Sequence, residues 1–240
     1  MARRAARKTV RKSAQSSARA AAPAAHTERD KIIEAFLALL SEKRFAAIGF
    51  DDIAQRTGLS LAQLRSEFAS TLAILAAHIK ATDRAVLAQD TADMAEEPAR
   101  ERLFDVLMRR LDVLAAHRDA VRSLLRSART NPPLALALNG LAVRSQQWML
   151  TAAGIGASGP GGMIRAQGLA MLFASVLQTW AEDDDPDQAR TMAALDRALA
   201  RGQRVLGLLD DLCSIPRRIC GLRSRRRRRS RGGSREAATA

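Results

Sequence analysis

The fold is decided by residues 50–68, which read Phe50-Asp51-Asp52-Ile53-Ala54-Gln55-Arg56-Thr57-Gly58-Leu59-Ser60-Leu61-Ala62-Gln63-Leu64-Arg65-Ser66-Glu67-Phe68. A small residue, Ala54, lets two short helices approach each other, and Gly58 supplies the positive φ of a tight turn. Ser60 is placed to cap the helix that follows. Apolar residues recur at intervals that bury one face of the pair against a third helix: Ile53, Leu59, Leu64 and Phe68. The spacing predicts a helix-turn-helix.

The exposed face of the second helix is the predicted contact with DNA. In a helix-turn-helix, the N-terminal residues of the second helix enter the major groove. Here those positions are Ser60, Leu61, Ala62, Gln63, Arg65 and Ser66. Gln63 is placed to read adenine, and a good bidentate pair is worth about 1 to 3 kcal/mol.

The net charge of +14 is concentrated at the two ends of the chain. Residues 1–27 contain seven Arg or Lys and no acid, and residues 216–240 contain ten Arg and one Glu. These ends therefore carry +7 and +9 of the total +14, which leaves about −2 for residues 28–215. The sequence pI of 11.4 describes the tails, and the part between them is nearly neutral.

Both tails are poor in large apolar residues, so we expect residues 1–27 and 216–240 to be disordered basic segments. Their charge suits nonspecific attraction to polyanions, with a steep salt dependence. Solvated tails that aid solubility fit the same composition. The first 26 residues also resemble an organellar transit peptide in composition, although they lack a clear apolar stripe.

Catalytic and metal-binding chemistry has few residues to use. The cysteines, Cys213 and Cys220, have no nearby His to complete a zinc site. The histidines, His26, His78 and His117, lack a Ser, Cys or metal-ligand partner at a recognisable spacing. We therefore predict no enzyme activity, no catalytic residues, no metal and no cofactor. No apolar run approaches the roughly 18 residues of a membrane span, which predicts a soluble, cytoplasmic protein.

The remaining pattern predicts an all-α protein in two parts. From residue 28 onward no useful length alternates with period two, and aromatic residues make up 3% of the chain. Thr27 and Asp30 form a capping signal before an apolar stripe that ends near residue 44. A longer helix is expected from about residue 71 to 89, which completes a helix-turn-helix domain at residues 28–90.

Further helical stripes follow Pro98. They lie at residues 103–114, 121–125, 134–150, 164–180 and 192–212, and Pro and Gly clusters such as residues 154–162 separate them. We expect residues 98–212 to form a helical bundle for dimerisation and effector binding.

Residues 32–75 resemble the N-terminal domain of the TetR family of one-component repressors. The resemblance rests on an apolar helix followed, in order, by Phe45, Ile53-Ala54, Gly58-Leu59-Ser60, Leu64 and Phe68. It covers about a fifth of the chain. It implies a TetR-like fold and a homodimer that binds a palindromic operator in double-stranded DNA. It also implies release of that DNA when a small molecule enters the C-terminal domain.

Three positions depart from the family pattern. The resemblance implies a phosphate-binding Tyr at the position of Arg65, a phosphate-binding Lys at that of Thr71, and an aromatic residue or His at that of Glu67. A carboxylate near the DNA-facing surface is repelled by phosphate. Arg65 can replace the Tyr contact with a charged one or read guanine bidentately. A helix-turn-helix that no longer binds DNA therefore stays open as an alternative.

The second half resembles, more diffusely, a group of proteins with the TetR-like fold, the lipid-binding accessory proteins of coenzyme Q biosynthesis. The matching residues are Arg102-Leu103, Arg109-Arg110-Leu111, Trp148, Ala153-Gly154, Arg165, Trp180-Ala181-Glu182-Asp183, Thr191 and Leu195-Asp196-Arg197. The resemblance implies a bound isoprenoid lipid and an amphipathic C-terminal helix on a membrane surface. Residues 205–212, with the polybasic residues from Arg217 onward, suit such a surface. Packing in a dimer interface or in the core is the other interpretation of this apolar segment.

Large, soft side chains in the second half predict a pocket for a small apolar ligand. The candidates are Phe104, Met108, Trp148, Met149, Met171, Phe173 and Trp180. Ordinary core packing is the alternative for each of them.

Overall fold

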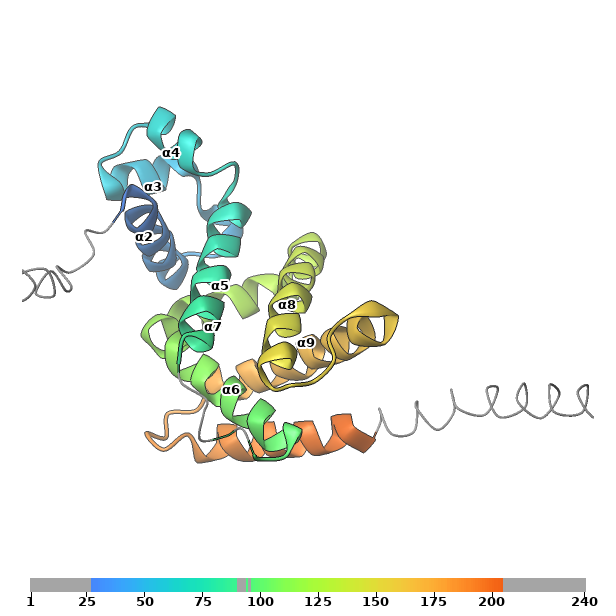
Figure 1. Ribbon diagram of the computed structural model, residues 1–240. Helices are drawn as coiled ribbons and strands as arrows, with labels where there is room; N and C mark the ends of the chain where they lie inside the picture. Colours follow the sequence, from blue (N-terminus) through green and yellow to red (C-terminus); the bar gives the residue numbers. More distant parts are fainter. Residues whose placement is uncertain (1–26, 90–93, 95, 205–240) are drawn as a thin grey trace, which may run out of the picture.

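A computed structural model describes residues 27–89, 94 and 96–204. These residues form helices joined by short connections and contain no strand, so the predicted all-α class is confirmed. Three helices, α2 (Glu28–Glu42), α3 (Phe50–Thr57) and α4 (Leu61–Glu67), gather at one end of the molecule (Figure 1). Helix 189–204 lies at the opposite end. The predictions for the basic tails, for the cysteines and for residues 205–212 fall outside the described residues.

The first core lies beneath α3 and α4 and is built on α2. The predicted capping box opens α2: the Thr27 hydroxyl accepts from Asp30 N at 3.2 Å, and the Asp30 carboxylate accepts from Thr27 N at 3.1 Å. The apolar stripe of α2 is buried together with residues of α3 and α4: Ile32, Phe36, Leu40, Ile53 and Leu64. A single 3₁₀ turn, η1 (Phe45–Ala47), connects α2 to the glycine that precedes α3.

Helix α5 (Thr71–Leu87) runs from the end of α4 into the second core. Its first half contributes Ile74 and Leu75 to the first core, whereas Val86 near its end lies in the second. One continuous helix therefore connects the two groups of buried side chains.

The second core is surrounded by α6 (Ala99–Leu114), the 3₁₀ turn η3 (Ala115–His117), α7 (Arg118–Arg129), α8 (Pro132–Ala152), α9 (Gly159–Ala181) and helix 189–204. Its most buried side chains include Leu107, Leu111, Met149, Trp180 and Leu195. The helices match the predicted stripes in number and order over the described residues.

The connection between α8 and α9 is shorter than expected, because α9 begins at Gly159. Pro160 then lies in the first turn of α9, where a missing N–H costs nothing. Gly162 is buried against the chain that enters the helix, and a Cβ there would lie 2.2 Å from the backbone of Ala157. Part of the expected glycine-rich loop is therefore the first turn of a helix, packed closely on its own connection.

Helix α7 joins the first core to the end of α9. Ala120 is buried among the residues of the first core. The Ser123 hydroxyl donates to the carbonyl of Lys43 at 2.9 Å, just after α2. The Arg122 guanidinium donates through Nε to the carbonyl of Ala181 at 2.9 Å, at the last residue of α9. Helix α7, like α5, therefore contacts both ends of the molecule.

Candidate nucleic-acid interface

The turn between α3 and α4 has the geometry that the sequence predicts. Gly58 adopts φ 71°, and its N–H donates to the carbonyl of Ala54 at 2.9 Å. The Thr57 hydroxyl donates to the carbonyl of Ile53 at 2.8 Å and accepts from Leu59 N at 3.3 Å. The end of α3 is thus closed by local hydrogen bonds, which fix the direction in which α4 leaves.

Helix α4 is held on the first core by two side chains. Leu64 is 1% exposed and Phe68, at its C-cap, is 3% exposed. The predicted DNA-facing residues of this helix are all solvent-exposed: Ser60, Leu61, Ala62, Gln63, Arg65 and Ser66. Thr71, in the first turn of α5, is half-buried. The α4 residues are therefore accessible to a ligand, whereas Thr71 is only partly so.

Gln63, which the sequence predicts to read adenine, forms a capping box with Ser60 at the start of α4. Its Oε1 accepts from the N–H of Ser60 at 2.9 Å and from the Ser60 hydroxyl at 2.9 Å, and its own N–H donates to Ser60 Oγ at 3.3 Å. A bidentate adenine contact needs both the amide oxygen and the amide nitrogen. Gln63 must therefore leave this capping box to read a base. The Ser-x-x-Gln spacing is the sequence signal for that role.

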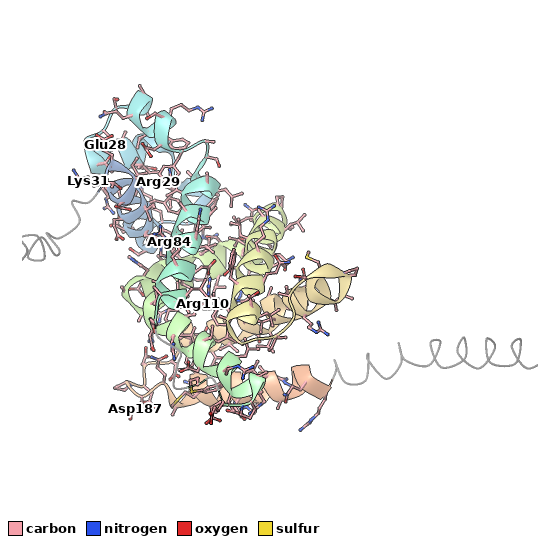
Figure 2. The ribbon with its side chains drawn as sticks, in the orientation of Figure 1. Glu28, Arg29, Lys31, Arg84, Arg110 and Asp187 are labelled. Carbon is pink, nitrogen blue, oxygen red and sulfur yellow. The ribbon has the colours of Figure 1, made fainter. Side chains whose placement is uncertain are left out.

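Glu67 is paired with Arg29, a residue that the sequence did not indicate. The Arg29 guanidinium lies 3.4 Å from Glu67 Oε2 and donates to the Glu67 carbonyl at 3.0 Å. Its Cζ also lies 4.2 Å from the centre of the Phe68 ring, in a cation–π contact. Figure 2 shows Arg29 with Glu28 and Lys31 in the first turn of α2, at the end of the molecule that carries α4. The acid that conflicts with phosphate is thus neutralised by a neighbouring helix.

Two ion pairs fasten α3 to the end of α2. Lys43 Nζ lies 2.6 Å from Asp52 Oδ1, and Arg56 lies 2.8 Å from Glu42. The hydrogen bond from Lys43, followed by one from the N–H of Gly49, lowers the pKa of Asp52 from its ordinary value. Arg65 differs from Arg56, because it has no carboxylate partner among the described residues. Its charge is therefore available to a ligand.

The predicted apolar pocket is not formed by the residues chosen for it. Met149, Phe173 and Trp180 are at most 4% exposed and pack in the second core. Trp148 and Met171 lie on the surface, 59% and 66% exposed. Phe104 and Met108 are half-buried against the core. These side chains were chosen for size and softness, but the faces of their helices point them in different directions, so the seven do not enclose one cavity.

Clefts lie elsewhere on the C-terminal helices, and the walls of two of them are mostly apolar. One, of about 460 Å³, lies between α6, the end of α8, α9 and helix 189–204. The other, of about 610 Å³, lies between α5 and α8 and includes Trp148 in its wall. Of the seven predicted pocket residues, Trp148 alone lines either of these two clefts.

A buried ion pair connects α5 to α6 at the centre of the molecule. Arg110, labelled in Figure 2, is 6% exposed and donates to Asp83 Oδ1. The Ser145 hydroxyl on α8 donates to the same oxygen at 2.7 Å. Three helices of the second core therefore meet at one carboxylate.

His78 lies beside this ion pair. Burial is the main reason that its pKa falls from 6.5 to about 4, and the positive charges of His117 and Arg110 lower it further. The His78 and His117 rings meet edge to face, with centroids 5.2 Å apart. This geometry describes a histidine kept neutral in the interior.

The described residues offer little for other chemistries. No group of three or more His, Cys, Asp or Glu side chains among them could hold a metal ion. Within the same part of the chain, every helix is too short or too polar to cross a membrane.

The fold is shared with solved regulators from three bacteria. A TetR transcriptional regulator from Nitrosomonas europaea is 22% identical and matches over 73% of this chain and 97% of its own, with a TM-score of 0.56. One from Rhodococcus sp. RHA1 is 22% identical over 72% and 93% of the two chains, with a TM-score of 0.53. A TetR-family protein from Syntrophomonas wolfei is 15% identical over 74% and 93%, also with a TM-score of 0.53. No protein-family model and no curated protein matches the sequence. The chain therefore has the fold of the TetR-family transcriptional regulators.

Proposed function

We propose that this chain is a cytoplasmic, DNA-binding transcriptional regulator in which α4 enters the major groove. One observation carries the proposal: α4 presents an unpaired Arg65 on an exposed polar face, while Glu67 is held by Arg29. A guanidinium without a carboxylate partner can pair with guanine or with phosphate without first breaking an ion pair.

The remaining exposed residues of α4 suit the groove. Leu61, 59% exposed in the first turn, offers an apolar contact of the kind made with thymine methyl groups. The hydroxyls of Ser60 and Ser66 donate to Gln63 within α4, and hydroxyls of this kind bind phosphates once they turn toward them. Lys31 on α2 and the basic residues 1–26, which precede Thr27 in the sequence, add the nonspecific attraction that α4 itself lacks.

The proposal includes a homodimer controlled by a small molecule. Two copies would place two α4 helices on half-sites about 34 Å apart, which is one turn of DNA, and would favour a palindromic operator. A ligand bound among the C-terminal helices would change the separation of the two α4 helices by favouring one dimer geometry. Helices α5 and α7 would transmit that change, because both join the two cores.

The test is selection of bound sequences from random duplex DNA by the full-length chain, with excess competitor to suppress binding by the tails. We expect one palindrome to be enriched. Leu61→Glu places an acid on the exposed start of α4, where a helix tolerates it, and should abolish the enrichment. Leu87→Glu, at the end of α5 where the side chain is 39% exposed, is the matched control outside the predicted dimerisation bundle and should leave it unchanged. Failure of the parent chain to enrich any sequence would refute the proposal.

The membrane-associated alternative has a narrower basis. Its surface helix was expected at residues 205–212, which lie outside the described residues. The solved structures compared above are named as transcriptional regulators. We therefore do not advance that alternative.

A further inference from the structure

The cleft of about 460 Å³ lies beside helix 189–204, at the end of the molecule opposite α4. Its volume falls within the range of small-molecule pockets, about 300 to 1,000 Å³. Aliphatic side chains from four helices and from the connection between α8 and α9 form most of its wall: Leu103, Leu150, Ile155, Ile164, Leu172 and Leu199. Such a wall favours a flexible hydrocarbon chain, since burial of apolar surface is the main gain that it offers.

Two glycines shape this cleft. Gly168 on α9 lines the cleft at an exposed position, and a Cβ there would meet no atom within 4 Å. At Gly202 a Cβ would lie 3.5 Å from Leu172 Cδ1, in ordinary contact. A larger side chain at Gly168 can therefore be added at the mouth of the cleft without displacing the protein around it.

Three arginines line the same cleft, and two of them carry unneutralised charge. Arg100 lies 2.5 Å from both Glu101 and Asp196. Arg165 donates to a backbone carbonyl, that of Gly156, at 3.1 Å. Neither Arg165 nor Arg201 has a carboxylate partner within the described part of the chain. The cleft thus combines an aliphatic interior with free guanidinium groups.

We propose that this cleft binds an aliphatic carboxylic acid, with its chain against the leucine and isoleucine side chains and its carboxylate on Arg165 or Arg201. Charge-assisted hydrogen bonds between guanidinium and carboxylate are among the strong ones in proteins. A cationic amphiphile is disfavoured here, since like charges repel. Binding of the acid does not depend on the proposed function. Only its role as the effector of DNA binding rests on that function.

The cleft has a direct route to the DNA-facing end. Leu103 and Arg110 belong to the same helix, α6, and Arg110 is bonded to Asp83 on α5. The first turn of α5 follows α4 after three residues. An acid that displaces α6 would therefore act on α5 and on the position of α4.

The experiment measures binding of decanoate, decanol and decylammonium to the full-length chain by isothermal titration calorimetry, without DNA. Decanoate should bind at least about tenfold more tightly than decanol, which corresponds to one charge-assisted hydrogen bond. Arg165→Gln combined with Arg201→Gln should remove that preference while leaving the affinity for decanol within about twofold. Equal affinity for the acid and the alcohol, or tighter binding of the ammonium, would overturn the proposal.

A cavity-filling variant tests the location. Gly168→Leu should abolish decanoate binding without lowering the melting temperature, since leucine is also the better helix former. Gly140→Leu is the matched control, because Gly140 is an exposed position of α8 where a Cβ meets nothing within 4 Å. Unchanged binding by Gly168→Leu would overturn the assignment. The assignment would also be overturned if the parent chain bound no decanoate and Gly168→Leu changed the sedimenting mass. That result would assign the cleft to a second copy of the chain.

The DNA-binding function and the acid-binding site are tested by independent experiments. The titration contains no DNA, and the sequence selection contains no acid. An enriched palindrome without decanoate binding would overturn this inference alone. Decanoate binding without an enriched sequence would overturn the DNA-binding function and leave the ligand site in place.

Discussion

The unit formed by α3 and α4 and the buried centre around Arg110 satisfy their polar groups in different ways. At the turn into α4, the partners are three or four residues apart in the sequence, as in the pairs Gly58 with Ala54 and Ser60 with Gln63. At the centre, Arg110 and Asp83 are 27 residues apart and meet only because α5 packs on α6. Local contacts can be replaced by water when lost, whereas a buried charge that loses its partner cannot be rehydrated. Single substitutions should therefore cost much more at the centre than at the turn.

The largest effect is expected for Asp83→Ala. It leaves the Arg110 guanidinium buried without its carboxylate and removes the acceptor of Ser145. The free energy of unfolding should fall by about 3 to 5 kcal/mol, measured by urea denaturation. The double variant Asp83→Leu with Arg110→Met should recover most of this loss, because an apolar pair removes the unpaired charge. A fall in unfolding free energy below about 1 kcal/mol for Asp83→Ala would show that the buried ion pair is no more costly to break than the local contacts at the turn.

The next effect is the pH dependence contributed by His78. Its pKa is about 4 in the folded chain and ordinarily 6.5, so between these values the unfolded chain binds more protons. Stability from this group is therefore complete above about pH 6.5 and falls by roughly 3 kcal/mol as the pH decreases toward 4. His78→Gln should give a flatter plot of unfolding free energy against pH over this window. An unchanged slope would show that the His78 ring is not shielded from water in the folded chain.

A smaller loss is expected at the cap of α4. Ser60→Ala removes the hydroxyl that accepts from Gln63 N and should lower the free energy of unfolding by about 1 kcal/mol. Ser66→Ala is the control, since its exposed hydroxyl bonds only to the carbonyl of Gln63 within the same helix at 2.7 Å. Thermal unfolding of both variants measures the difference. A fall in unfolding free energy for Ser60→Ala as large as that for Asp83→Ala would show that the local cap matters as much as the buried ion pair.

The smallest effect concerns Glu67 and affects DNA affinity more than stability. Glu67→Gln removes the negative charge next to the DNA-facing surface and should raise the affinity for the selected duplex about two- to fivefold. Arg29→Ala should lower the affinity, because it removes a cation and exposes Glu67. Fluorescence anisotropy at two salt concentrations measures both changes, which should shrink at the higher one. An affinity that falls on Glu67→Gln would show that the pair with Arg29 is needed to position α4.

The elements that the sequence predicts well are those determined by short spacings. Thr27 with Asp30, Ala54 with Gly58, and the burial of Leu64 follow from helix periodicity and capping, and all are found in the structure. The pair of Arg29 with Glu67 is not predictable in this way, because 38 residues separate its members. Its existence depends on how α2 packs against α4.

The ligand cleft shows the same limit more strongly. Trp148 and Met149 are neighbours in the sequence, yet one is 59% exposed and the other is fully buried. Residue type alone made both of them pocket candidates. The aliphatic cleft is assembled from α6, α8, α9 and helix 189–204. A cavity of this kind is a property of helix packing and is not encoded in any one segment.

Whether α4 reads DNA through Arg65 is tested by the affinity of Arg65→Ala for the selected palindrome. We expect a loss of about tenfold or more, the equivalent of one bidentate base contact, with affinity for random duplex changed far less. Arg197→Ala, which removes an exposed arginine of helix 189–204, should leave both affinities unchanged. Equal affinity of the parent and Arg65→Ala for the palindrome would show that Arg65 does not contact the bases.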